Sequence, residues 1–489
     1  MTFVWLSPQK ILRKNIYSRY LGLWEYKIRK NLEKRNVSIK IETAAIFENE
    51  NKITEKERLK MATDEAPIRI ALLGAGTVGS QTARLLVEQK EALEKRVGHG
   101  IELVGVATLD PVDDPWIDQS IVTDNAAQLV TRADIVIELI GGIEPARTFV
   151  LSAIEHGASV VTANKALLAK HGSEIYRAAA DKGVDVYFEA SVGGAIPIIC
   201  PLRNSLVGDK INRIMGIVNG TTNYILDEMT TKNLDFDSVL KDAQEKGFAE
   251  ADPTADIDGF DAASKAAIMA CLAFNRDVRI DDVYVEGIRS ITAEDIAAAG
   301  ELNRVIKLLA VVEQDETGIS AGVYPVMIPE EHQLAKVGGS FNAVFVEGEA
   351  SDDLMFYGRG AGGAPTASAV VGDAITAARH RAKGVTGSSI PLFSDAPIKN
   401  AADGEDVYFM RMRVKDQVGV LAKVSQIFAD SNVSIKAVQQ HEKEESSKTH
   451  DLWILTHATT GRTIRDISDK LEKSDFIDSV LSTMRVFGE

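Results

Sequence analysis

Residues 68–79, Ile-Arg-Ile-Ala-Leu-Leu-Gly-Ala-Gly-Thr-Val-Gly, constrain the fold of this chain more than any other stretch. An apolar strand runs directly into Gly74, Gly76 and Gly79, and residues 82–89 then have the pattern of a helix. In such a turn the first glycine permits a tight bend, the second lets a pyrophosphate approach the backbone, and the third lets helix and strand pack closely. The helix start also offers unpaired N–H groups to phosphates. The strand–turn–helix context therefore favours a nicotinamide or flavin dinucleotide site over a merely structural turn.

The pattern after this turn alternates strands and helices. Residues 101–109, 133–140 and 158–162 are predicted strands, and residues 145–156 are a predicted helix between the last two. Strands that alternate with helices imply a parallel, doubly wound sheet. We therefore expect a Rossmann-type α/β dinucleotide-binding domain over residues 67–190.

The character of the sequence changes beyond residue 188. Glycine turns, a long alanine-rich helix at 261–274 and alternating strands near 319–326 and 343–349 predict an α+β substrate-binding and dimerisation domain over residues 191–362. Residues 363–390 are expected to pack back on the first domain. A polar, proline-bearing linker at 394–406 precedes the last unit.

The last predicted unit spans residues 407–489. Alternating strands and amphipathic helices follow one another in the order βαββαβ, which is the order of a ferredoxin-like module. The strands are predicted at 407–414, 434–440, 452–456 and 479–486, and the helices at 418–429 and 463–473.

Charge is spread unevenly over the 489 residues. The formal net charge is −16, but residues 1–60 hold 14 basic and 7 acidic side chains, a net of +7, and the remainder has a net of −23. The strongly negative charge of residues 61–489 argues against nucleic acid or an anionic membrane as partner. The two cysteines, Cys200 and Cys271, stand in apolar sequence surroundings and are predicted to be small buried side chains. So few cysteines argue against a disulfide framework and fit a reduced cytoplasmic setting. No apolar run reaches the length that a bilayer crossing needs.

Residues 1–66 form a basic extension without glycine-rich turns. A transit peptide should be poor in acidic residues, which this segment is not, and in a nucleic-acid-binding arm the basic residues should be clustered. We expect translation to begin at Met61, directly before the first strand, and the chain before Ala66 to have low order.

The densest cluster of carboxylates lies at residues 247–261, and an alanine-rich helix follows it at once. Asp261 and Lys265 stand four residues apart, so they share a helix face. An exposed ion pair is the plain alternative, but Lys265 is the only base among Ala, Ile, Met, Cys and Leu side chains. An amine in such surroundings loses basicity and can exchange protons near neutral pH. A calcium loop is excluded because Thr254 and Lys265 would fall at its first and last ligand positions.

Two other features point to a ligand crevice. A Thr-Ala-Asn-Lys string follows a predicted parallel strand and places Lys165 at its carboxyl end, where ligands bind in such sheets. A solvated lysine that opens a helix is the alternative interpretation. Glycine-rich stretches at 191–197 and 358–366 permit close backbone approach to a ligand, and residues 218–224 offer polar caps for a helix start.

Taken together, these strings resemble one family. Over residues 67–489 the chain resembles homoserine dehydrogenase. The resemblance rests on the glycine turn and on the strings Thr-Ala-Asn-Lys, Phe-Glu-Ala-Ser-Val-Gly-Gly-Ala-Ile-Pro, Gly-Ile-Val-Asn-Gly-Thr-Thr-Asn, Glu-Ala-Asp-Pro and Asp-Ala-Ala-Ser-Lys. The last unit resembles an ACT domain. The resemblance implies NAD(P)(H)-dependent interconversion of L-aspartate 4-semialdehyde and L-homoserine, on the route to threonine, methionine and isoleucine.

The resemblance also assigns catalytic and substrate-binding roles by motif. Lys265 would be the general acid/base that protonates the aldehyde oxygen as hydride arrives. Lys165 would lie beside nicotinamide and substrate. Glu250 and Asp261 would hold the substrate through its ammonium and nearby groups.

Cofactor and metal contacts follow in the same way from the resemblance. A structural sodium ion would be held by hard oxygen ligands, namely Glu189 and the backbone carbonyls of Val192, Gly194 and Ile196. The dinucleotide would contact Gly74, Gly76, Thr77, Val78, Gly79, Lys165, Gly247 and Gly362.

The choice between NAD and NADP depends on the end of the second predicted strand. Asp110 could bind a ribose hydroxyl there, although it lies 31 residues past Gly79, further than usual. The following Pro-Val-Asp-Asp carries no base for a 2′-phosphate. We therefore expect NAD to be the preferred cofactor, while the family often accepts NADP.

ACT modules commonly pair and bind amino acids between them, so a homodimer or homotetramer is expected. The string Asp-Gln-Val-Gly-Val-Leu, with Gly419 in the turn after the first strand of the unit, fits a ligand loop. The resemblance therefore suggests feedback inhibition by threonine.

Two other functions remain open at the level of sequence. Another amino-acid oxidoreductase, such as an aspartate dehydrogenase, would share the architecture, but the acidic string and Lys265 argue against it. A catalytically silent amino-acid sensor would be expected to lose Lys165, Asp261 or Lys265, and all three are present.

Overall fold

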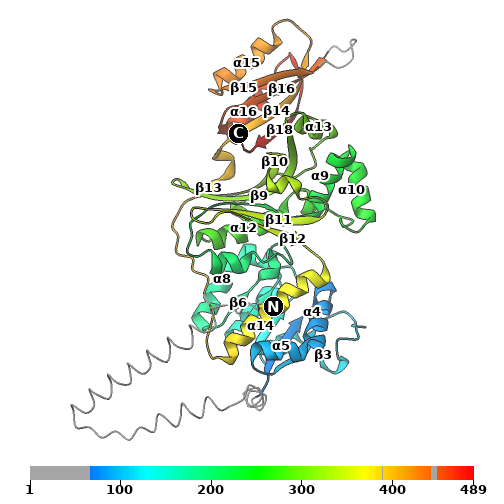
Figure 1. The fold of residues 1–489 in the computed structure, drawn as a ribbon, viewed down its shortest axis with the longest axis vertical. Coiled ribbons are helices and arrows are strands. Elements are labelled where there is room, and N and C mark those ends of the chain that lie inside the picture. The colour runs from blue at the N-terminus through cyan, green and yellow to red at the C-terminus, as the bar shows by residue number, and fades with distance from the viewer. Residues whose placement is uncertain (1–65, 388, 442–448, 489) are drawn as a thin grey trace, which may run out of the picture. The chain divides into compact units, whose positions relative to one another are not determined.

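The computed structural model describes residues 66–387, 389–441 and 449–488 (Figure 1). All of them belong to one compact unit, Ala62–Glu489. The basic extension, with the predicted start at Met61 and the predicted low order before Ala66, lies outside the described residues. None of the helices within these ranges has the length and apolar content that a bilayer crossing requires.

The first sheet is parallel throughout, with the strand order β3-β2-β1-β4-β5-β6. The order reverses between β1 and β4, as in a Rossmann fold, and the predicted doubly wound sheet is confirmed. Its strands are β1 (Ile68–Leu73), β2 (Ile101–Ala107), β3 (Val122–Thr123), β4 (Ile135–Glu138), β5 (Ser159–Thr162) and β6 (Val186–Tyr187).

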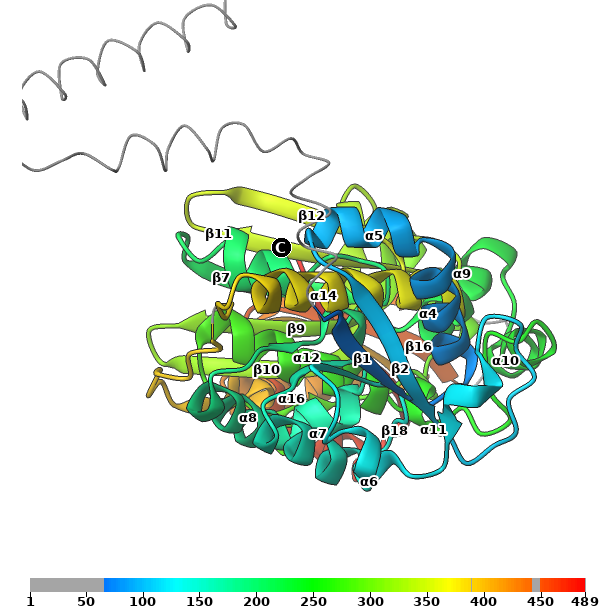
Figure 2. The same cartoon turned by 90° about the horizontal axis from the view of Figure 1, so that it is seen from below.

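Helices cover both faces of this sheet (Figure 2). Because side chains alternate along a strand, Ile70 and Leu72 of β1 pack with one set of helices, and Ala71 and Leu73 pack with the other. The first set is α4 (Thr77–Glu88), α5 (Lys90–Val97) and α14 (Gly363–Ala382), and the second is α6 (Ala126–Leu129), α7 (Ala146–Glu155) and α8 (Lys165–Lys182). Helix α14 therefore returns from far along the chain to lie against α4.

A second, mixed sheet has the main order β12-β11-β7-β9-β10-β18-β14-β16-β15. Sequence patterns predicted the regions of β10 and β11 but not the long β9, because the apolar run in β9 lacks a clear alternation with polar residues. The strands are β7 (Ile211–Ile217), β8 (Tyr284–Val285), β9 (Arg304–Asp315), β10 (Gly318–Pro329), β11 (Phe341–Gly348), β12 (Asp352–Arg359), β13 (Ile398–Asn400), β14 (Glu405–Lys415), β15 (Ile435–His441), β16 (Thr449–Thr456), β17 (Thr459–Thr460) and β18 (Ile477–Val486).

The C-terminal unit has the predicted ferredoxin-like order, with α15 (Val420–Asp430) and α16 (Gly461–Glu472) between its strands. The sequence suggested a separate unit beyond a linker, but the structure joins its sheet to that of the middle region. Strand β18 pairs in parallel with β10 through Val326 and Arg485, and part of the linker forms β13 on β10. The sheet is therefore continuous from one region into the other.

Buried polar side chains join the same two regions. Arg411 of β14 donates to Asp295 of α13 (Ala293–Glu301) over 2.9 Å and to the Thr292 hydroxyl over 2.9 Å. The Ser482 hydroxyl of β18 also donates to Asp295, over 2.6 Å. Removing one partner of a buried ion pair leaves an uncompensated charge, so this contact fixes the C-terminal unit firmly on the middle region.

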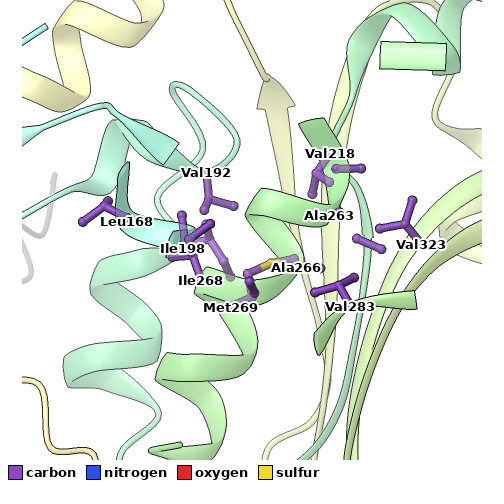
Figure 3. Close-up of a cluster of buried hydrophobic side chains, with 14 of the residues drawn as sticks. Leu168, Val192, Ile198, Val218, Ala263, Ala266, Ile268, Met269, Val283 and Val323 are labelled. Carbon is purple, nitrogen blue, oxygen red and sulfur yellow. The ribbon is translucent and has the colours of Figure 1, made fainter. Parts of the chain in front are cut away.

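Helix α12 (Phe260–Phe274) is the apolar centre of the middle region (Figure 3). Ala263, Ala266 and Met269 are each fully buried, among side chains of the first domain and of the second sheet. Cys271 in this helix is buried as predicted, but Cys200 is exposed, so the predicted burial was wrong for Cys200. A helix buried on nearly every side leaves little water around any charge that it carries. The remaining helices of this region are α9 (Gly220–Lys232), α10 (Phe236–Glu245) and α11 (Thr254–Ile257).

Candidate active site

The glycine turn after β1 has the geometry that its sequence predicts. Gly74 has φ +97°, and a Cβ there would lie 2.7 Å from the Leu139 carbonyl oxygen. A Cβ on Gly79 would lie 2.0 Å from the Gly74 carbonyl oxygen, so α4 meets the turn at the closest possible approach. At Gly76, by contrast, none of the described heavy atoms lies within 4 Å of such a Cβ. Gly74 and Gly79 are thus required by the fold, while Gly76 leaves open space beside the backbone.

Two helix N-termini face this turn. Gly76 is the N-cap of α4 and Gly362 is the N-cap of α14, and neither of these two described helices has a side-chain cap or an acidic residue in its first turn. A Cβ on Gly363 would lie 2.9 Å from the Thr77 carbonyl oxygen, so the two helix starts are in contact. Unpaired N–H groups and two partial positive charges meet there, which suits the pyrophosphate of a dinucleotide.

Lys265 lies in α12 and is buried, with 10% of its side chain exposed. Its Nζ donates to the Val218 carbonyl oxygen and to Asp261 Oδ2, each over 2.5 Å. The amine therefore points away from bulk solvent and into a polar cluster. Because α12 is otherwise apolar, these two acceptors fix the position of the charge.

Asp261 is the centre of this polar cluster. Lys165 Nζ lies 3.2 Å from Asp261 Oδ1, and Asn219 donates to Asp261 Oδ2 over 2.9 Å and to Asp256 Oδ1 over 2.7 Å. Burial alone would raise the pKa of the Asp261 carboxyl, but the charges of Lys265 and Lys165 outweigh burial and lower the pKa below its ordinary value. The carboxylate is therefore ionised throughout the neutral range and holds both amines.

Lys165 connects the first domain to this cluster. It opens α8 directly after β5, and its side chain is 42% exposed. Asn164 caps α8 by accepting from the Leu167 N–H, and the buried Glu138 at the end of β4 accepts from the Thr162 hydroxyl over 2.6 Å. These contacts hold the turn between β5 and α8, from which Lys165 reaches Asp261.

Glu250 is outside the hydrogen-bonded cluster of the described residues. It lies in the exposed loop after α10 with Gly247, which has φ +74°. Gln244 donates to the Glu250 backbone carbonyl over 3.1 Å, so the backbone is held while the carboxylate remains exposed.

The predicted sodium loop is a buried turn with two left-handed glycines, Gly193 and Gly194. The Glu189 carboxylate accepts from the N–H groups of Ile199 and Cys200 over 2.8 and 2.7 Å. Its pKa is raised by burial, and burial together with the nearby Glu189 raises the pKa of Asp373 to about 7. The described residues contain no group of three His, Cys, Asp or Glu side chains that could hold a metal ion, so backbone carbonyls would have to complete any site. The buried carboxyl groups of Glu189 and Asp373 lie close together, and the positive charge of a cation would offset their repulsion.

The sequence did not assign Asn219 or Asp256 to the site. Residues 218–224 were expected to cap a helix, and the Asn219 side chain does cap α9 by accepting from the Thr222 N–H. The second function of Asn219, donating to Asp256 and Asp261, depends on contacts 37 and 42 residues away along the chain. In the sequence, the only indication of this role was that Asn219 belongs to Gly-Ile-Val-Asn-Gly-Thr-Thr-Asn, one of the motifs that carry the family resemblance.

Two uncapped helix starts that suit a pyrophosphate, together with a buried amine–carboxylate pair, fit the class of NAD(P)-dependent oxidoreductases that act on a CH–OH group. Profiles of three families match the chain: the NAD-binding domain of homoserine dehydrogenase at residues 74–189, homoserine dehydrogenase at 197–375, and the ACT domain at 408–475. The chain belongs to the homoserine dehydrogenase family.

Individual relatives agree with the family profiles. Homoserine dehydrogenase of Corynebacterium glutamicum is 44% identical over 86% of this chain and 95% of that relative. The crystal structure of a homoserine dehydrogenase from Thiobacillus denitrificans has a TM-score of 0.81 at 41% identity, covering 86% of this chain and 98% of that one. A hyperthermophilic archaeal homoserine dehydrogenase in complex with NADPH has a TM-score of 0.56 at 26% identity, covering 64% of this chain and 98% of that one.

The glycine turn generates a paired prediction. Gly76→Ala should leave the melting temperature unchanged but weaken NAD(P)H binding, because its Cβ enters the space beside the backbone where the pyrophosphate is expected. Gly79→Ala should lower both the melting temperature and the affinity for NAD(P)H, because its Cβ collides with the Gly74 carbonyl. Fluorescence titration with NADH and NADPH, together with thermal unfolding, measures both effects. Unchanged cofactor affinity in Gly76→Ala would contradict the proposed phosphate position.

Proposed function

We propose that this chain interconverts L-aspartate 4-semialdehyde and L-homoserine with Lys265 as the proton donor and acceptor. The observation that carries the proposal is the buried Lys265 ammonium, held by Asp261 and the Val218 carbonyl. Lys165 brings the carboxyl edge of the dinucleotide-binding sheet to the same carboxylate. Carbonyl reduction needs a hydride and a proton at one carbon–oxygen bond, and this arrangement places a proton source at that edge.

The roles of the residues follow from their contacts. When bound, the nicotinamide cofactor would supply or accept the hydride. In the reductive direction the Lys265 ammonium gives its proton to the carbonyl oxygen and becomes a neutral amine, which later regains a proton from solvent. In the oxidative direction the neutral amine takes the hydroxyl proton. Asp261 fixes the position of the Lys265 amine, and Lys165 supplies a second positive charge beside the developing alkoxide.

Substrate binding is assigned to carboxylates. Asp261 is already engaged by Lys265, Lys165 and Asn219, whereas the Glu250 carboxylate is exposed at the edge of the acidic segment. We assign Glu250 to the substrate ammonium and Asp261 mainly to the catalytic amines.

The preferred cofactor is proposed to be NAD. Strand β2 ends at Ala107, so Asp110 stands in the exposed bend after the strand rather than at its last residue. Its carboxylate can accept from a ribose hydroxyl and would repel a 2′-phosphate. The archaeal relative was solved in complex with NADPH, so NADPH is the alternative cofactor to be compared. The ratio of kcat/KM for NADH and NADPH measures the preference.

Replacement of Lys265 tests the acid/base assignment. Lys265→Ala should lower kcat for aspartate semialdehyde reduction by about 10²–10⁴-fold while cofactor affinity stays near that of the wild type. Oxidation of NADH or NADPH followed at steady state gives the rate. Lys170→Ala, an exposed lysine of α8, is the control and should react like the wild type. Equal rates for Lys265→Ala and the wild type would contradict the assignment of Lys265 as the general acid/base.

We also propose a structural sodium ion held by Glu189 and the carbonyls of Val192, Gly194 and Ile196. A cation would offset the crowding of two buried carboxyls, whose pKa values are raised. Replacing tetramethylammonium by Na⁺ at constant ionic strength should raise the melting temperature of the wild type, because an ion that binds only the folded state stabilises it. Glu189→Gln should lose this response, and the exposed Glu102→Gln should keep it. A melting temperature independent of Na⁺ would contradict the site.

Threonine is proposed as the effector of the C-terminal ACT domain. Gly419 in its candidate ligand loop has φ +90° and is the N-cap of α15, so a side chain there distorts the loop without touching Lys265, Asp261 or Lys165. Truncation of the unit is a poor test, because it would remove the pairing of β18 with β10 and leave Asp295 without Arg411.

Gly419→Ala should shift threonine inhibition to several-fold higher concentration without changing kcat, because alanine is strained in a left-handed conformation. Gly404→Ala is the control, since its φ is −68° and its nearest neighbour is 3.5 Å away. Activity measured against threonine concentration separates the two variants. Absence of inhibition in the wild type would refute the effector.

A further inference from the structure

One segment of the middle region contacts both helix α11, which carries Asp256 of the polar cluster, and the C-terminal unit. Residues 286–295 run from β8 to α13. At its start, the Glu286 N–H donates to the Val323 carbonyl over 2.7 Å, and the Ile288 N–H donates to the Ile257 carbonyl over 2.8 Å. The segment is therefore pinned to β10 on one side and to the end of α11 on the other.

Arg289 adds side-chain contacts to the same short helix. Its Nε donates to Asp258 Oδ1, and one terminal nitrogen donates to Thr254 Oγ1 over 3.1 Å and to Asp258 Oδ2 over 3.3 Å. Thr254 is the first residue of α11 and Asp258 its C-cap, so the guanidinium spans the helix from end to end. A Cβ on Gly287 would lie 2.4 Å from the Ile257 carbonyl oxygen, which leaves the segment no room to move closer.

Helix α11 matters because it carries Asp256. Asp256 Oδ1 accepts from Asn219 Nδ2, and the same nitrogen donates to Asp261, which holds Lys265. A rotation of α11 would move Asp256, and the Asn219 amide would have to follow or lose one acceptor. A displacement of about 1 Å in a catalytic group can cost 10²-fold in rate.

We propose that Arg289 is a positioning residue for the reaction: by spanning α11, it fixes Asp256, and through Asn219 it fixes the direction of the Asp261–Lys265 pair. Arg289 itself is 52% exposed and touches none of the groups assigned to chemistry. Its ion pair with Asp258 adds little to global stability, since exposed pairs contribute little. Its effect is therefore expected in turnover rather than in the melting temperature.

The other end of the segment is held by the C-terminal unit. Thr292 and Asp295 accept from Arg411, and Asp295 also accepts from Ser482. A cavity of about 350 Å³ lies between the segment and β18, which leaves space for the segment to shift on that side. Its lining includes Glu286, Gly287, Ser290, Ile291, Ser482 and Met484. The same ten residues thus connect the ACT domain to the helix that Arg289 holds.

The test uses the full chain and compares Arg289→Gln with Arg289→Lys and Arg279→Gln. Arg279 is a matched control, because it is 57% exposed and pairs with Asp277 in the same region without contacting α11. Arg289→Gln should lower kcat/KM for homoserine by about tenfold, with the KM of the cofactor and the melting temperature near wild-type values. Arg289→Lys should recover part of the loss by restoring the charge, and Arg279→Gln should behave like the wild type.

A double-mutant comparison separates positioning from a general structural effect. If Arg289 acts through Asp258, then Asp258→Asn should reproduce the loss, and the double variant should lose no more than either single variant. Wild-type kcat/KM in Arg289→Gln, or losses that multiply in the double variant, would overturn the proposal. The inference rests on the proposed role of Lys265. If Lys265→Ala is inactive while Arg289→Gln is unaffected, only the inference about Arg289 fails.

Discussion

The buried ion pair between Lys265 and Asp261 is the interaction on which the site depends. Helix α12 is apolar and enclosed, so a lone ammonium there would be costly, and the adjacent carboxylate makes it tolerable. The same carboxylate accepts from Asn219 and lies within ion-pair distance of Lys165. One ionised group therefore organises two amines and an amide that come from different parts of the chain. Loss of its charge would release all of them.

The glycine turn is the second constraint, and it links the fold to the cofactor. The contacts at Gly74 and Gly79 draw α4 against the end of β1, and Gly363 brings the start of α14 to the same place. Two helix starts without side-chain caps then present N–H groups to one point. Lys165 emerges from the same edge of the sheet, so in the proposed assignment a dinucleotide bound there would lie next to the buried pair.

Much of this was predictable because the patterns are local. A strand followed by spaced glycines predicted the dinucleotide turn, the spacing of four predicted the Asp261–Lys265 pair, and the alternation of elements predicted both the doubly wound sheet and the C-terminal unit. Contacts between distant segments were not predictable. The bonds from Asn219 to Asp256 and Asp261, and the pairing of β18 with β10, join residues whose local sequence gives no sign of a partner. The sequence context also misled at Cys200, since apolar neighbours along the chain do not ensure burial.

A crystal structure of the ternary complex with NAD⁺ and L-homoserine tests the central claim most directly. The account predicts that the substrate hydroxyl oxygen lies within hydrogen-bond distance of Lys265 Nζ, with Asp261 still bound to the amine and the nicotinamide on the far side of the reacting carbon. A complex in which Lys265 stays on the Val218 carbonyl, remote from that oxygen, while another base contacts the hydroxyl would contradict it.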